Sequence, residues 1–409
     1  MNNKFTIIIP TRERANTLKY CLQTCVAQDY INLEILVSDN FSSDNTKEVV
    51  DSFRDSRIRY INTGKRLSMS GNWEFALSHI KEGWAGFIGD DDGFLPGSIS
   101  LANELLMKSN KVDDVIYWYD KTPWYFWAGP FGGSGNDNNL FLSIIKDYSP
   151  FIGKDRLLKL ASFMTTYECY PIIYHGFVHT ELVNRIKEKS KNSLFFQSCI
   201  PDVYSSIPIS VFSKGILNSP LPLSINGVSK NSTGGSSLFR DEDITVNKFI
   251  SEPNIPFNQA LNFENNSVIM AELNILIADS FLQFLDNVDF EFCEPKKAIK
   301  EFVLLNLIGF LRKKDYYREI TDKLIDHNGL QYADLKTNSI YRYQQSGKKH
   351  FFYKYKYKIN CSHLKTETIA DIAPLYHNAM KVSTFEKIRQ KTGKTYKVLK
   401  RYIRFVLNV

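Results

Sequence analysis

The sequence predicts an α/β protein with a Rossmann-type, mostly parallel sheet flanked by helices, followed by a mainly helical C-terminal region. In the first hundred residues, short apolar runs rich in β-branched side chains alternate with segments whose apolar residues recur at helical spacing. This alternation is typical of parallel strands joined by helices. Beyond about residue 267 the spacing is helical, with Ile269, Leu273 and Leu276 on one face.

The predicted elements follow one another closely along the chain. Strands are expected at 5–9, 34–37, 58–61 and 84–88, and helices at 14–28, about 44–53 and 72–80. Further helical signals occur near 155–164 and 180–188, and the Ser- and Gly-rich segment 227–241 predicts a flexible connection. At roughly 100–200 residues per domain, 409 residues allow two or three domains.

Charge is unevenly distributed along the chain, whose net charge is +7. Residues 340–409 hold 16 Lys or Arg and 3 Asp or Glu, which leaves 35 basic and 41 acidic residues in the rest. This distribution argues against a nucleic-acid partner, because the body carries no basic excess. The basic tail instead predicts an anionic partner such as a membrane surface. The six cysteines lack the close pairs of a zinc site or a disulfide scaffold.

Hydropathy gives an expectation about location. The N-terminal segment MNNKFTIIIP lacks the apolar core and cleavage site of a signal peptide. The longest apolar stretches, such as 303–311, fall short of the roughly 18 residues that indicate a membrane span. We therefore expect a cytoplasmic protein that is soluble or peripheral at the inner face of the cell membrane.

Three consecutive aspartates, Asp90, Asp91 and Asp92, follow the predicted strand 84–88. In open α/β sheets ligands bind at the carboxyl edge of the strands. Two carboxylates about 6 Å apart repel by roughly 3 kcal/mol at an effective dielectric constant of 20, so a compensating cation or hydrogen-bond donor groups are expected. Mg²⁺ or Mn²⁺, which also binds diphosphates, suits such oxygen ligands. The alternative is a solvated acidic turn.

The context of this triplet favours a binding site. The first strand ends at Pro10 and Thr11 and the second at Asp39, which would meet at the same sheet edge. The segments IIIPTRERANTLKYCLQTCVAQDYINLEILVSDNFSSDNT and FIGDDDGFLPG resemble the family-2 glycosyltransferases of GT-A fold, which transfer sugars from nucleotide donors. The resemblance covers about residues 4–110 and extends more weakly to about 240.

The resemblance implies roles for the matching residues. The residues implied in nucleotide-sugar binding are Pro10, Thr11, Arg14, Asp39, Asp90 and Asp91. Asp39 would receive the edge of the base, although Asn40 and Phe41 depart from the usual pattern and leave the base open. Asp92 and Asp90 would bind the metal, with Asp92 as the first choice. The alternatives are a turn or capping residue for Asp39 and a surface residue for Arg14.

A general base and a contact to the diphosphate are predicted further along the chain. Asp202, after a proline and before an apolar run, lies where the resemblance implies an acidic residue, and it is the candidate base that takes the proton of the acceptor hydroxyl. Its alternative is a helix N-cap. Lys230 or Arg240, in the Ser/Gly-rich segment, would reach the diphosphate, or else be solvated.

Acceptor contacts are predicted from histidine and aromatic residues. His175 is a candidate hydrogen-bond partner of an acceptor sugar. Most aromatic residues of 117–131 are expected in the core, with Trp124 and Trp127 as the more exposed pair and Trp124 as an acceptor contact. At the C-terminus, 396–406 forms a basic amphipathic pattern that suits a membrane surface or a helix packed on the protein.

These observations predict a glycosyltransferase that transfers a sugar from a nucleotide-diphosphate donor to a hydroxyl of a glycan or lipid-linked acceptor, with Mn²⁺ or Mg²⁺ and with inversion. Its predicted context is bacterial surface polysaccharide synthesis, such as O-antigen or capsule. Residues 1–240 are expected to form the catalytic domain, with a donor half at about 1–110 and an acceptor half at about 111–240, and 241–409 the helical region. The alternatives are a sugar-nucleotide-forming nucleotidyltransferase and a non-enzymatic scaffold at the membrane.

Overall fold

A computed structural model describes most of the N-terminal half of the chain and several segments of the C-terminal half. The described residues are 2–133, 136–142, 160–161, 170–230, 232, 252, 255–261, 273–291, 295–312, 317–331 and 357–381. Within this part of the chain, no helix is long and apolar enough to cross a membrane.

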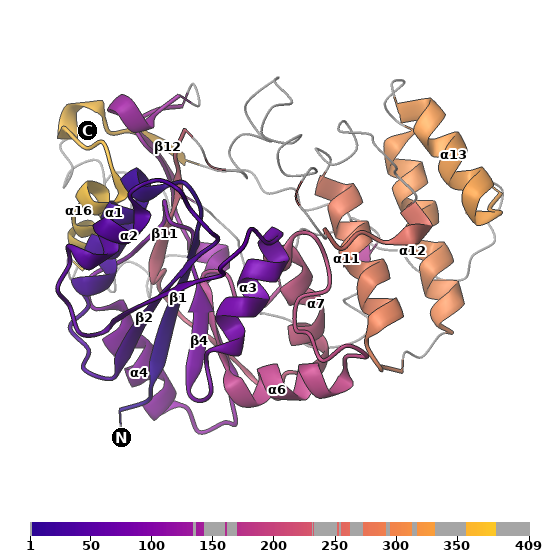
Figure 1. Ribbon diagram of the computed structural model, residues 1–409, viewed down its shortest axis with the longest axis horizontal. Helices are drawn as coiled ribbons and strands as arrows, with labels where there is room; N and C mark the ends of the chain where they lie inside the picture. Colours follow the sequence, from indigo (N-terminus) through magenta and orange to yellow (C-terminus); the bar gives the residue numbers. More distant parts are fainter. Residues whose placement is uncertain are drawn as a thin grey trace, which may run out of the picture.

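A seven-stranded sheet forms the centre of the N-terminal part, in the order β10-β6-β9-β4-β1-β2-β3. Figure 1 shows its strands β1, β2 and β4 next to helices α1, α3 and α4. β1 pairs in parallel with β2 and β4, whereas β9 runs antiparallel to both of its neighbours. The bounds are β1 (Phe5–Thr11), β2 (Leu33–Asp39), β3 (Ile58–Asn62), β4 (Trp84–Phe87), β6 (Val115–Tyr117), β9 (Gly176–His179) and β10 (Ile216–Asn218). The predicted mixed α/β class with a mostly parallel sheet is confirmed.

Both faces of this sheet are buried, which explains the continuous apolar runs of β1 and β2. Ile7 and Ile9 of β1 belong to the cluster that contains Leu18 of α1, whereas Ile8 lies on the other face with Trp73 of α3. The helices around the sheet are α1 (Ala15–Val26), α2 (Thr46–Asp51), α3 (Met69–Ser78), α4 (Ser98–Lys108), α6 (Thr180–Lys189) and α7 (Pro201–Phe212).

A second, five-stranded sheet lies beside the carboxyl edge of the first, in the order β12-β8-β7-β11-β5. Its strands are β5 (Gly93–Phe94), β7 (Trp124–Phe126), β8 (Asn139–Leu142), β11 (Ser224–Val228) and β12 (Tyr357–Asn360). β5 follows the aspartate triplet directly and pairs with β11. The second sheet therefore brings β11 against the triplet.

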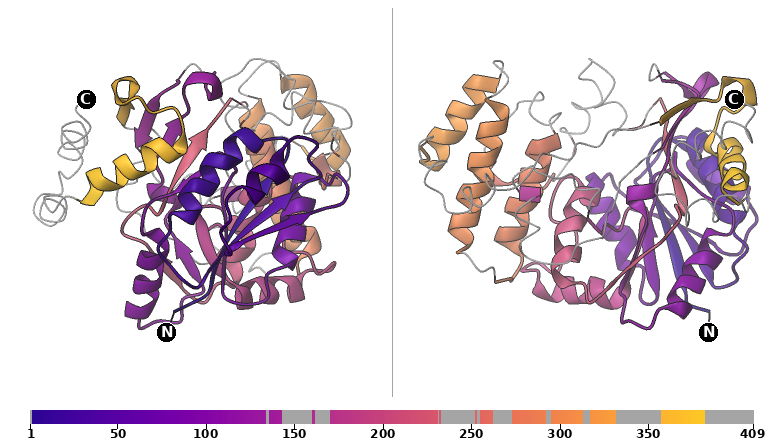
Figure 2. Two further views of the ribbon diagram at one scale, coloured as in Figure 1. Left: turned by 60° about the vertical axis from the view of Figure 1, so that its left-hand side comes forward. Right: turned by 180° about the vertical axis from the view of Figure 1, so that it is seen from behind.

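The C-terminal half divides between two places in the molecule. Helices α11 (Leu273–Asn287), α12 (Lys296–Leu311) and α13 (Arg318–Asn328) pack side by side, and α11 contacts α7 (Figure 1). In contrast, β12 pairs with β8, and α16 (Ile369–Lys381) packs on α1 at the opposite side (Figure 2). The expected mainly helical region is present, and the domain boundary near 240 stays a prediction.

Several elements differ in detail from the predicted ones. α3 begins at Met69 because Ser68 is its N-cap and accepts a hydrogen bond from the Gly71 N–H. The expected connection 227–241 starts inside β11, and 231 and 233–241 lie outside the described residues, as do most of 155–164 and all of 396–406. The described cysteines, Cys21, Cys25, Cys199 and Cys361, are free and buried.

Candidate functional site

The carboxyl ends of β1, β2 and β4 place the predicted donor-site residues at one edge of the sheet. Thr11 and Asp39 are direct partners in the parallel register of β1 and β2. The hydroxyl of Thr11 donates to Asp90 Oδ2 at 2.6 Å. The register therefore brings the ends of three strands together, as the sequence predicts.

Asp92 points into the protein and is fully buried. Its Oδ2 accepts hydrogen bonds from the Gly89 N–H at 2.6 Å and the Tyr174 hydroxyl at 2.6 Å, and lies 3.0 Å from His175 Nε2. Its Oδ1 accepts from the Gly227 N–H at 2.8 Å. Burial alone would raise the pKa of Asp92, but His175 and these donors outweigh it and lower the pKa. Asp92 is therefore an ionised anchor within the protein.

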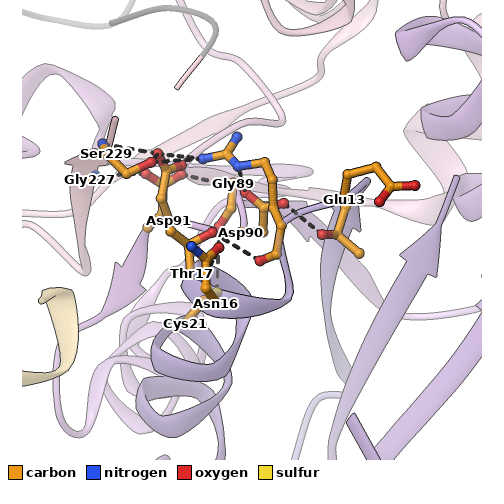
Figure 3. A network of polar contacts seen from close by, with 12 residues as sticks. Glu13, Asn16, Thr17, Cys21, Gly89, Asp90, Asp91, Gly227 and Ser229 are labelled. Atoms are coloured by element: carbon orange, nitrogen blue, oxygen red, sulfur yellow. Dashed lines mark hydrogen bonds and ion pairs between the residues drawn. The ribbon is translucent and has the colours of Figure 1, made fainter. Parts of the chain in front are cut away.

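Asp90 and Asp91 instead contact the guanidinium group of Arg14 (Figure 3). Arg14 Nε lies 3.0 Å from Asp90 Oδ1, and Arg14 Nη2 lies 2.6 Å from Asp91 Oδ2. Asp91 Oδ2 also accepts from the hydroxyl of Ser229 at 2.6 Å. Burial raises the pKa of Asp90 even though Arg14 and the hydroxyl of Thr11 lower it. One arginine thus faces two buried carboxylates.

The backbone before α1 holds Arg14 in this position. Glu13 has a left-handed conformation, with φ of 55°, which is unusual for a residue other than glycine. Its carboxylate accepts from the Ser43 N–H at 2.7 Å, and Asp44 accepts from the Ala15 N–H at 3.0 Å. The turn after β2 therefore fixes the turn after β1. Asp44 also accepts from the N–H of Thr46, the first residue of α2, at 3.1 Å.

Gly227 of β11 and Trp127, which follows β7, complete the surroundings of the triplet. A Cβ added to Gly227 would lie 1.7 Å from the backbone oxygen of Asp91, so only glycine fits this close approach. The indole N–H of Trp127 donates to that same oxygen at 3.1 Å. The expectation that Trp127 is exposed is therefore wrong, because its ring is fully buried and its one donor is used inside the protein.

Asp39 lies at the end of β2 and is also buried. Its Oδ2 accepts from the Tyr60 hydroxyl at 2.5 Å and from the Asn62 side chain at 3.0 Å, and its Oδ1 accepts from the Ser42 N–H. Burial and this hydrogen bond raise the pKa of Tyr60 to about 12. Asp39 thus has local partners, and contact with a base stays a prediction.

Asp202 lies in the first turn of α7 and is partly exposed. Ile200, not Asp202, is the N-cap residue of this helix, so the N-cap interpretation of Asp202 is wrong. Burial raises its pKa, although the Val203 N–H and the interaction with His175 act in the opposite direction. A carboxylate with a raised pKa is a better proton acceptor, which suits a general base.

The loop before Asp202 is fixed by a buried carboxylate that the sequence gives no sign of. Asp279 of α11 accepts from the Ser198 hydroxyl at 2.6 Å and from the Asn258 N–H at 2.7 Å. The Ser198 carbonyl accepts from the hydroxyl of Ser70 in α3. The helical region therefore supports the start of α7, on which Asp202 lies.

The remaining predicted residues lie in different surroundings. His175 is fully buried, with Nδ1 at 2.6 Å from Ser224 Oγ and Nε2 facing Asp92, so no ring nitrogen is left for an acceptor sugar. Trp124 is partly buried in β7. Lys230 is exposed one residue after Ser229, and Arg240 lies outside the described residues. Pro10, in β1, is partly buried.

A divalent cation suits only part of this arrangement. In the described segments, no group of three or more His, Cys, Asp or Glu side chains is placed to hold a metal. Both oxygens of Asp92 are taken by protein donors. Asp90 and Asp91 direct their carboxylates toward a cationic group, and Mg²⁺ often uses one or two carboxylates together with substrate phosphates. These two residues therefore fit a metal that arrives with a diphosphate.

Comparison with known proteins supports the same region. Residues 6–169 match the model of the glycosyl transferase family 2, the same family that the sequence motifs resemble. Members of this class are enzymes. The match ends before Asp202 and before the helical region.

Two relatives share the N-terminal segment. One is a GalNAc(5)-diNAcBac-PP-undecaprenol beta-1,3-glucosyltransferase of Campylobacter jejuni, 35% identical over 111 residues, which are 26% of this chain and 35% of the relative. Another is the UDP-Glc:alpha-D-GlcNAc-diphosphoundecaprenol beta-1,3-glucosyltransferase WfgD of Escherichia coli, 29% identical over 26% of this chain and 42% of the relative. The matched segment thus spans less than half of either relative.

Solved structures show a weaker overall likeness. TarS of S. aureus in complex with UDP-GlcNAc is 14% identical, with a TM-score of 0.43 over 85% of this chain and 94% of that chain.

Replacing Gly227 tests the close packing of β11 on the triplet. Gly227→Ala should lower the free energy of unfolding by about 1–3 kcal/mol, because the new methyl group forces β11 away from Asp91. Urea denaturation measures this. In the control Gly71→Ala, the added Cβ meets only side-chain atoms, at 3.2 Å, and a smaller change is expected. Equal effects of the two substitutions would contradict the packing described here.

The buried carboxylate of Asp279 predicts a pH-dependent contribution to stability. Burial raises its pKa from 3.8 to about 7. The folded state then binds a proton that the unfolded state releases, so this group stabilises the protein most below pH 4 and loses that contribution as the pH rises through 7. The stability lost in Asp279→Asn should therefore shrink between pH 4 and 8, measured by urea denaturation. A constant or growing loss would contradict the raised pKa.

Proposed function

We propose that this protein is a glycosyltransferase that transfers a sugar from a nucleotide-diphosphate donor to a hydroxyl group of a lipid-linked glycan. The observation that carries the proposal is the pair Asp90 and Asp91. Both are buried at the carboxyl edge of the sheet, and both form ion pairs with the long side chain of Arg14. The family-2 match across this same edge supports it.

The donor would lie across the ends of β1, β2 and β4. Pro10, Thr11 and Asp39 would contact the nucleoside, and Asp90 and Asp91 would lie near the diphosphate. Lys230, exposed next to Ser229, would add a positive charge toward the diphosphate.

Asp90 and Asp91 would hold Mn²⁺ or Mg²⁺ when the donor binds. Such a cation neutralises the charge that develops on the departing diphosphate. Arg14 lies within reach of the same charges and would assist there. Asp92 keeps the triplet in place through its buried contacts.

Asp202 would act as the general base of an inverting transfer. As the acceptor oxygen forms a bond to the anomeric carbon, the bond from that carbon to the diphosphate oxygen breaks and the nucleoside diphosphate leaves with the electron pair. The hydroxyl proton passes to Asp202, whose raised pKa favours this step.

The names of the two bacterial relatives, which act on undecaprenol-diphosphate-linked sugars, support a lipid-linked acceptor in polysaccharide synthesis. Such an acceptor lies at a membrane, where the basic residues of 340–409 would favour an anionic surface. Trp124 is proposed as an acceptor-side contact.

Slow hydrolysis of the donor tests the reaction class without knowledge of the acceptor. The purified protein with UDP-glucose and Mn²⁺ should release UDP, detected by a coupled assay, and addition of EDTA should abolish the release. Release of pyrophosphate would indicate a nucleotidyltransferase. If no nucleotide sugar in a panel of UDP, GDP and dTDP donors is hydrolysed or raises the melting temperature, the proposal fails.

Asp202→Asn tests the general base. Turnover should fall by roughly 10²- to 10⁴-fold, because a carboxamide cannot take the proton, while the dissociation constant of the donor changes little. The matched control is Asp29→Asn, an exposed residue before β2 at the opposite sheet edge, which should keep its turnover. Near-normal turnover of the Asp202 variant would rule out its role as base.

A further inference from the structure

Arg14 occupies the place at which the proposed metal would meet its ligands. Its guanidinium group lies 3.0 Å from Asp90 Oδ1 and 2.6 Å from Asp91 Oδ2, and it also donates to Ser229 Oγ at 3.1 Å. The Arg14 side chain is only 18% exposed, and the two carboxylate side chains are 3% and 6% exposed. The ion pairs are thus largely shielded from water. Charge interactions are stronger in such a buried place than in water.

A metal ion and Arg14 compete for the same two carboxylates. A divalent cation beside the guanidinium would place three positive charges against two negative ones, so metal binding to the protein alone is disfavoured by repulsion. A nucleoside diphosphate adds negative charge and offers oxygen atoms that bind both the metal and the guanidinium group. With the diphosphate present, Arg14 can exchange one set of oxygen atoms for another.

We propose that Arg14 is a built-in counter-cation that makes metal binding conditional on the nucleotide: it pairs with Asp90 and Asp91 in the free protein and moves to the diphosphate when the metal and donor bind together. This inference rests on the proposed function, because it needs a diphosphate donor. Its consequence is that free Mn²⁺ is excluded from the empty site, and that metal and nucleotide bind cooperatively.

The position of Arg14 allows such an exchange. Its backbone is fixed at the start of α1, where its carbonyl oxygen accepts from the Leu18 N–H at 3.0 Å. The guanidinium group lies at the end of a long side chain, and that side chain as a whole keeps 18% exposure. By contrast, Asp92 is held by His175 and by the Gly227 N–H, so the release of Arg14 leaves the fixed part of the triplet unchanged.

Calorimetric titration with Mn²⁺ alone tests the inference directly. Arg14→Met removes the charge but keeps a side chain of related length, and it should bind Mn²⁺ at least about 10-fold more tightly than the wild type. Arg14→Lys keeps the charge and should bind Mn²⁺ about as weakly as the wild type. The control Arg57→Met removes an arginine that pairs with Asp55 before β3 and should leave Mn²⁺ binding unchanged. If Arg14→Met binds Mn²⁺ no more tightly than the wild type, the inference is overturned.

A second titration measures the cooperativity. In the wild type, UDP should increase the affinity for Mn²⁺, and Mn²⁺ should increase the affinity for UDP by the same factor. This factor should fall at least about 10-fold in Arg14→Met, and an undiminished factor contradicts the inference. Thermal melting shows in addition whether Arg14→Met is folded. Mn²⁺ alone should raise the melting temperature of Arg14→Met more than that of the wild type.

These outcomes separate the inference from the proposed function. If UDP and every other nucleoside diphosphate fail to bind any variant, the donor assignment fails. The comparison in Mn²⁺ alone still decides whether Arg14 competes with a metal for Asp90 and Asp91.

Discussion

Neutralising three consecutive buried aspartates is the constraint on which the rest of the site depends. The chain meets it in two ways. Asp92 turns inward, where His175, Tyr174 and backbone N–H groups surround it. Asp90 and Asp91 turn toward Arg14. The triplet is thus divided into a fixed anchor and a pair whose counter-charge lies on a long side chain.

Two residues at or next to the triplet's partners have an unfavourable backbone conformation. His175 has a left-handed conformation, with φ of 49°, and Glu13 has another at 55°. Such conformations cost of order 1–3 kcal/mol each and persist where the surroundings fix them. Here they aim the imidazole at Asp92 and the guanidinium at the other two carboxylates. Gly227 provides the close approach of β11 that completes the anchor.

Distant parts of the chain meet at this edge. β11 supplies Gly227, and Ser229 follows directly after this strand. β12 and α16 return from the C-terminal half to the second sheet and α1, and Asp279 of α11 fixes the loop before α7. Residues outside the family-2 match therefore shape both sides of the proposed reaction centre.

The sequence could predict the first four strands, because apolar periodicity is visible over a few neighbouring residues. It could also predict that Thr11, Asp39 and the triplet meet, because the carboxyl ends of parallel strands lie at one edge of the sheet. It could not predict which aspartate points inward. That choice depends on His175 and Gly227, which are 83 or more residues away from Asp92 and carry no pairing signal in a single sequence. The sequence gives no sign that Trp127 is buried either, because its partner is the backbone oxygen of Asp91, which is distant along the chain.

The most direct test of this division of the triplet is a crystal structure of the protein with Mn²⁺ and UDP. The account predicts the metal on Asp90 and Asp91, the guanidinium group of Arg14 on the diphosphate, and Asp92 still bound to His175, Tyr174 and Gly227. A metal coordinated by Asp92, or an Arg14 that still pairs with both carboxylates beside a bound metal, would contradict it.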